Sequence, residues 1–199
     1  MFNTDTAREK IFVSENARTV LNDWFDALQE RDKRFGGVHV NGRAWRAELR
    51  RAEPPYGVML CEGYHALMGQ LGKQMALKDI DRLALALFVS VAVHAKSNNR
   101  SGKRSFAAQL GEEIKGRTCL SALRFDRLQQ AEEPDVFCRQ LIRAVKLRGA
   151  EGVNILSLAD GIFLWAREWQ AREEHQPENI DPFSRNKIRW ANEYISTAK

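Results

Sequence analysis

The chain has 199 residues, of which 44% are hydrophobic, enough to bury the core of one or two small domains. Its N-terminus lacks the apolar core of a signal peptide, and its longest apolar run, around Leu83–Ala95, is too short to span a membrane. We therefore expect a cytoplasmic protein without membrane association. The three cysteines, Cys61, Cys119 and Cys138, lie far apart and predict reduced thiols instead of a disulfide framework or a zinc site.

The net charge of +5 is localised in two zones. Residues 41–51 contain four basic and one acidic side chain, and residues 96–148 contain twelve basic and six acidic ones. The rest of the chain has fifteen basic and nineteen acidic residues, so its charge is −4. Because the basic residues follow helical periodicity, they predict a folded surface that holds a polyanion, with nucleic acid as the obvious candidate.

Helical spacing dominates the first half of the chain. Leu21, Trp24, Phe25 and Leu28 predict a first helix from about Asn16 to Lys33, capped from within Ser14–Asn16. Residues 35–42 are rich in glycine and predict a loop or a small hairpin.

A second helix carries the first basic zone. Arg43, Arg46 and Arg50 recur at i, i+3 and i+7 and share one face, and Pro54-Pro55 ends the helix. A third helix should start near Tyr56 and direct a group of apolar side chains inward, namely Met59, Leu60, Leu67 and Met68. The most apolar helix, Asp79–Ala95, is predicted to lie in the centre of the core.

The second half of the chain begins with a basic, polar segment, residues 96–104, that predicts a mobile loop. Helices are expected around residues 106–113 and 120–131, from Pro134 onward, over 155–173, and after Asp181-Pro182. In the helix that Pro134 opens, Arg139, Arg143 and Lys146 share one face. The last helix is expected to carry Ile188, Ala191 and Ile195. The predicted fold is all-α, with eight to nine helices in two lobes, residues 1–95 and 96–199.

The sequence contains no convincing catalytic or cofactor-binding constellation. Gly111, Gly116, Arg117 and Thr118 have the spacing of a phosphate-binding loop, but that motif requires a preceding strand, and a helix is expected there. Cys61 and His65 could share a helix face, yet no second pair completes a metal site. We therefore expect neither an enzyme nor a cofactor or metal. The tryptophans have core spacing, which favours contacts with the nucleic-acid backbone over base stacking.

The linear order of these features resembles the CasB family, the small subunit of the type I-E CRISPR surveillance complex Cascade. The resemblance covers roughly residues 43–195. It is carried by Arg50-Arg51-Ala52-Glu53-Pro54, the long apolar helix, the basic loop, and above all the segment Arg124–Ala131. Within that segment, Gln129 and Gln130 depart from the usual apolar and basic residues.

The resemblance implies a non-catalytic, all-helical subunit that contacts nucleic-acid backbone and helps to hold the R-loop in antiviral defence. Its implied partners are the guide RNA, the target DNA with its displaced strand, the Cascade backbone and large subunits, and a second copy of itself. A free-standing helical DNA-binding regulator is the alternative. The predicted nucleic-acid surface comprises Arg43, Arg46, Arg50, Arg51, Lys96, Arg100, Lys103, Arg104, Arg117, Arg124, Arg127, Arg139, Arg143 and Lys146.

Overall fold

The structure is a computed structural model that describes residues 14–100 and 104–198. The α-helices of this part are α1 (Glu15–Ala27), α2 (Gly42–Arg51), α3 (Glu62–Gly72), α4 (Asp79–Ala92), α5 (Phe106–Gly111), α6 (Ala122–Gln129), α7 (Pro134–Arg148), α8 (Ile155–Glu173) and α9 (Asn186–Ile195). Two antiparallel hairpins pair β1 (Lys33–Phe35) with β2 (Val38–Val40), and β3 (Glu113–Ile114) with β4 (Arg117–Thr118). Short 3₁₀ turns form η1 (Gly57–Leu60), η3 (Gly149–Glu151) and η4 (Pro182–Ser184). The predicted all-α fold is confirmed.

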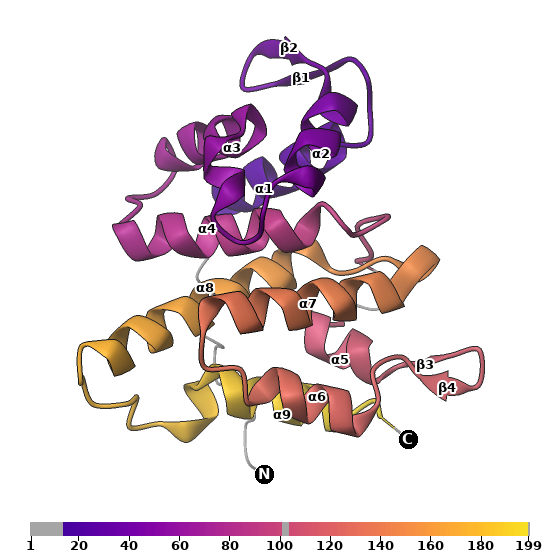
Figure 1. The fold of residues 1–199 in the computed structure, drawn as a ribbon, viewed down its shortest axis with the longest axis vertical. Coiled ribbons are helices and arrows are strands. Elements are labelled where there is room, and N and C mark those ends of the chain that lie inside the picture. Colours follow the sequence, from indigo (N-terminus) through magenta and orange to yellow (C-terminus); the bar gives the residue numbers. More distant parts are fainter. Residues whose placement is uncertain (1–13, 101–103, 199) are drawn as a thin grey trace.

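Helix α4 lies between two layers of the molecule (Figure 1). Helices α1, α2 and α3 lie on one side of it, α7 and α8 on the other, and α5, α6 and α9 form the layer beyond. Every residue of 84–93 is buried, as its apolar sequence predicts. The helix starts where the Asp81 carboxylate accepts a hydrogen bond from the Lys78 backbone N–H, 3.1 Å away.

One hydrophobic core runs through both halves of the chain. Trp24 of α1 contacts Phe88 of α4 with ring centroids 5.9 Å apart, and Phe137 of α7 stacks on Trp165 of α8 at 4.0 Å. Helix α9 joins through Trp190, whose ring lies so close to Gly161 that a Cβ there would come within 2.4 Å of it. The two halves on either side of residue 95 are therefore joined by shared apolar packing.

Several predicted boundaries and faces are wrong. The first helix ends at Ala27 instead of Lys33, because the chain turns into the β1–β2 hairpin, whose glycines Gly36 and Gly37 have positive φ. Leu60, expected inside, is 88% exposed because it ends the short turn η1 instead of lying within α3. In α9 the buried residues are Asn186, Trp190 and Tyr194, while Ile195 is exposed.

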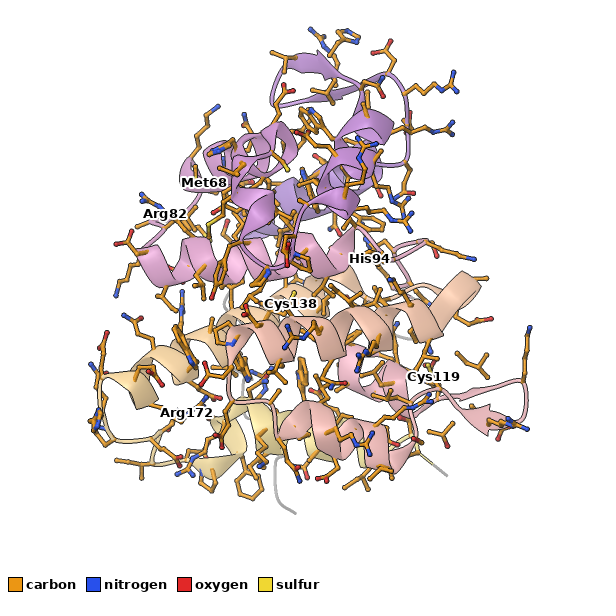
Figure 2. The ribbon with its side chains drawn as sticks, in the orientation of Figure 1. Met68, Arg82, His94, Cys119, Cys138 and Arg172 are labelled. Atoms are coloured by element: carbon orange, nitrogen blue, oxygen red, sulfur yellow. The ribbon has the colours of Figure 1, made fainter. Side chains whose placement is uncertain are left out.

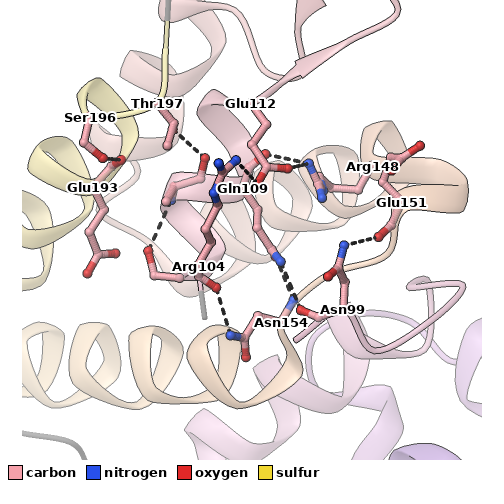
Figure 3. Close-up of polar contacts among 12 residues, drawn as sticks. Asn99, Arg104, Gln109, Glu112, Arg148, Glu151, Asn154, Glu193, Ser196 and Thr197 are labelled. Carbon is pink, nitrogen blue, oxygen red and sulfur yellow. Dashed lines mark hydrogen bonds and ion pairs between the residues drawn. The ribbon is translucent and has the colours of Figure 1, made fainter. Parts of the chain in front are cut away.

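The start of the basic segment at residues 96–104 is held in place, contrary to the predicted mobile loop. Asn98 forms a parallel bridge with Val153, and the Asn99 backbone N–H donates to the Val153 carbonyl at 2.8 Å. The Asn99 side chain donates to the Glu151 carbonyl (Figure 3). Together with the Val153 N–H, which donates to the Ser97 carbonyl, these contacts hold residues 97–99, while residues 101–103 lie outside the described part of the chain.

An ion pair between the buried Asp81 and the exposed Arg167 joins α4 to α8. Asp81, only 1% exposed, accepts hydrogen bonds from Arg167 Nε at 3.1 Å and Nη2 at 2.9 Å. We expect Asp81→Ala to lower the free energy of unfolding by about 2 kcal/mol, because it also removes the cap of α4. Urea denaturation would measure this. Asp79→Ala, which breaks only an exposed pair with Arg82, should change stability by less than about 0.5 kcal/mol, and equal effects would contradict the assignment.

Candidate nucleic-acid interface

Helix α7 separates its two faces as the sequence predicts. Phe137, Leu141 and Val145 are buried against α4 and α8, while the helix presents Arg139, Arg143 and Lys146 to solvent. Pro134 occupies the first turn, where its missing N–H leaves no intrahelical hydrogen bond unmade. The three cations therefore lie on a rigid element fixed by the core.

Three grooves surround the basic face of α7. The first, groove A, has a volume of about 350 Å³ and lies between α2, the end of α4 and α7. It is lined by Arg50 of α2, by His94 and by all three exposed cations of α7. The structure thus joins the two arginine clusters that lie almost ninety residues apart in the sequence.

The other two grooves extend the same surface. Groove B, about 540 Å³, lies between α6 and α7 and is lined by Arg124, Arg127, Arg143 and Lys146. Groove C, about 1110 Å³, is lined by Arg117 of β4, again by Arg124 and Arg127, and by residues of α9. Because groove B shares two cations with each neighbour, the three grooves form one continuous surface.

We call the cations of this surface the basic band, which consists of Arg50, Arg117, Arg124, Arg127, Arg139, Arg143 and Lys146. All of them are exposed. None of the seven makes an ion pair or a side-chain hydrogen bond with another described residue. No aspartate or glutamate lines any of the three grooves. The band therefore concentrates positive charge on one surface, which suits a polyanion.

Helix α6 buries two apolar side chains and exposes its arginines. Phe125 and Leu128 are buried, and Phe125 stacks on Tyr194 of α9 at 4.0 Å between ring centroids. Arg124 and Arg127 lie on the exposed side. Leu123 is 62% exposed as well, so an apolar side chain lies next to the basic ones on the solvent side of α6.

Two predicted site residues of α2 bind the protein's own backbone. Arg46 donates from Nε to the Val93 carbonyl at 3.0 Å and from Nη2 to the Ala95 carbonyl, so its guanidinium caps the C-terminus of α4. It also donates to the Gln29 side chain. Arg43 donates from Nε to the Gln29 carbonyl at 3.0 Å. Arg50, one turn further along, makes no such contact and lines groove A.

A network of polar contacts surrounds Arg148 at the C-terminal end of α7 (Figure 3). Arg148 is 1% exposed and donates to the carbonyls of Gly152 and Gln109 and to the Glu112 carboxylate. Arg104, a predicted site residue, also pairs with Glu112 at 2.8 Å. Both arginines are thus compensated, unlike the cations of the band.

The remaining predicted residues lie outside the three grooves. Arg51, Lys96 and Arg100 are exposed but line none of them. Lys103 lies outside the described residues.

The segment with phosphate-loop spacing folds as a hairpin. It follows α5, and its turn at Lys115 and Gly116 has φ values of 54° and 78°. Helix α5 stands where that motif needs a strand, and β3 and β4 take the place of the phosphate-binding loop itself. Arg117 therefore contributes to groove C instead of to a nucleotide cradle.

The described residues offer no metal site. No three His, Cys, Asp or Glu side chains within 14–100 and 104–198 come together in a way that could bind a metal ion. Burial raises the pKa of the Cys138 thiol to about 12, so it stays protonated and unreactive. In the same part of the chain, no helix combines the length and hydropathy that a membrane span requires.

The family described as CRISPR-associated protein Cse2 matches residues 45–194 of the chain. The chain belongs to this family. Cse2 and CasB are the same family, so the resemblance drawn from the sequence is confirmed, and membership makes the protein a small structural subunit of the type I-E CRISPR complex Cascade. No curated protein and no solved structure matches the chain. Every member of the basic band lies within the part that matches Cse2.

The contrast between Arg46 and Arg50 is testable. We expect Arg46→Ala to lower the free energy of unfolding by about 2 kcal/mol, because it leaves carbonyls at the end of α4 without a charged donor. Arg50→Ala should change it by less than about 0.5 kcal/mol, because that side chain is exposed. Chemical denaturation of both variants measures the difference. Equal losses of stability would contradict the structural assignment of Arg46.

Proposed function

We propose that the basic band binds the sugar-phosphate backbone of nucleic acid within Cascade, with the displaced DNA strand of the R-loop as its ligand. The observation that carries this proposal is the continuity of seven unpaired cations through three grooves without a lining carboxylate. Guide pairing supplies sequence specificity in such a complex, so this subunit needs to supply only charge and shape.

The burial of four of the five tryptophans supports backbone contact. Trp24, Trp45, Trp165 and Trp190 are buried in the core and unavailable for stacking on bases. Phosphate contacts from arginine and lysine position a strand without reading its sequence. A subunit of this kind acts without a catalytic step, by holding the displaced strand away from its complement. The proposed protein neighbours are the backbone subunits that form a filament along the guide RNA, the large subunit, and an adjoining second copy of this chain.

Charge reversal of α7 tests the proposal. We expect Arg139→Glu, Arg143→Glu and Lys146→Glu together to weaken binding of oligothymidine to the full chain by more than about tenfold. The slope of log K against log salt should fall in magnitude by about 2, since each lost contact with single-stranded DNA contributes about 0.7. Fluorescence anisotropy over a salt series would measure both quantities, with circular dichroism to confirm folding.

A matched control reverses the same number of exposed cations away from the band, namely Arg31, Lys73 and Lys187. This control should reduce affinity far less, although it changes the net charge equally. Affinity and slope that stay unchanged in the α7 variant would contradict the proposal. In reconstituted Cascade the α7 variant should shorten the lifetime of the R-loop, and an unchanged lifetime would exclude the displaced strand as the ligand.

A further inference from the structure

Groove A is lined by a histidine in addition to its four cations. His94 follows the C-terminal end of α4 (Figure 2) and is partly buried beneath the cations of α2 and α7. None of the sequence patterns marks this residue as part of a site, because its neighbours in the chain are apolar and its basic neighbours come from other helices. Only the fold brings it into groove A.

The two ring nitrogens of His94 have different surroundings. Nδ1 is buried without a hydrogen-bond partner among the described residues. Nε2 is not among the buried unpartnered atoms and makes no hydrogen bond to a described residue, so it retains contact with solvent. Orphaned buried N–H groups are rarer in proteins than under-used acceptors, which favours the neutral tautomer with its proton on Nε2. The ring therefore has a donor available to the groove.

We propose that groove A seats one phosphate group of the nucleic acid against His94, whose Nε2–H donates a hydrogen bond to a phosphate oxygen. The inference rests on the proposed function and identifies the point where the strand is held most specifically. Arginine and lysine reach phosphates as flexible, exposed side chains, whereas the His94 ring is short and partly buried just beyond the end of α4. It has fewer alternative positions than those side chains, which makes groove A a defined seat within an otherwise sequence-independent and adaptable band.

The seat has a consequence for pH dependence. The charged groups around His94 are all basic: Arg46 and Arg50 from α2, and Arg139, Arg143 and Lys146 from α7. Burial, together with Lys146, Arg50 and Arg46, lowers the pKa of His94 to about 4, so the ring is neutral near pH 7. A phosphate against the ring raises this pKa, so the complex binds more protons than the free protein. Affinity must then increase as pH falls toward 4.

The test measures affinity for oligothymidine of about 20 nucleotides at about pH 7.5 and about pH 5.5, because thymine and phosphodiesters do not titrate in this range. We expect the full chain to gain about fivefold in affinity at the lower pH. His94→Gln keeps an N–H donor but cannot titrate, so it should lose that gain. His94→Leu removes the donor and should weaken binding about tenfold at the higher pH.

His65→Gln is the matched control, because His65 is exposed on α3, outside the band. It should keep both the affinity and the pH dependence of the unchanged chain. If His94→Gln retains the full gain at low pH, or if His94→Leu binds as the unchanged chain does, no phosphate lies against His94. That outcome would leave the proposed function intact as long as reversal of the α7 cations still weakens binding. If the reversal also has no effect, the proposed function fails as well.

Discussion

Helix α4 has apolar neighbours on every side, and the position of every other layer follows from its burial. Residues 84–93 cannot face water without exposing a continuous apolar surface, so α7 and α8 cover one side and α1, α2 and α3 the other. The C-terminal end of this helix needs partners for its free carbonyls, and Arg46 supplies them. Helix α2 is thereby fixed beside that end.

This arrangement explains how a dispersed set of cations becomes one surface. Helices α2 and α7 both pack against α4, so their outward faces border the same groove. Helix α6 packs on α7, which places Arg124 and Arg127 beside Arg143. Glu112, near the C-terminal end of α7, is paired with Arg148 and Arg104 and not with a cation of the basic band.

The sequence predicts what local periodicity determines and fails where a tertiary contact decides. The two faces of α7 and the central burial of α4 follow from spacing alone. Arg46 and Arg50 have the same helical phase, yet one caps α4 and the other lines groove A, a difference that depends on where α4 ends. The spacing does indicate that Arg148 lies on the core face of α7, because it follows the buried Leu141 by seven residues, which is about two helical turns. His94 and the joining of the grooves have no sequence signal, because they arise between helices.

The central claim is that the seven cations act as one continuous track for a single strand. The most direct measurement is the salt dependence of oligothymidine binding as the length of the oligonucleotide increases. A continuous track predicts that the magnitude of the slope of log K against log salt grows with length and levels off near 5, about 0.7 for each of seven contacts. A slope that stays between about 2 and 3 at every length would show that only one groove, with three or four cations, binds the strand, and would contradict the account.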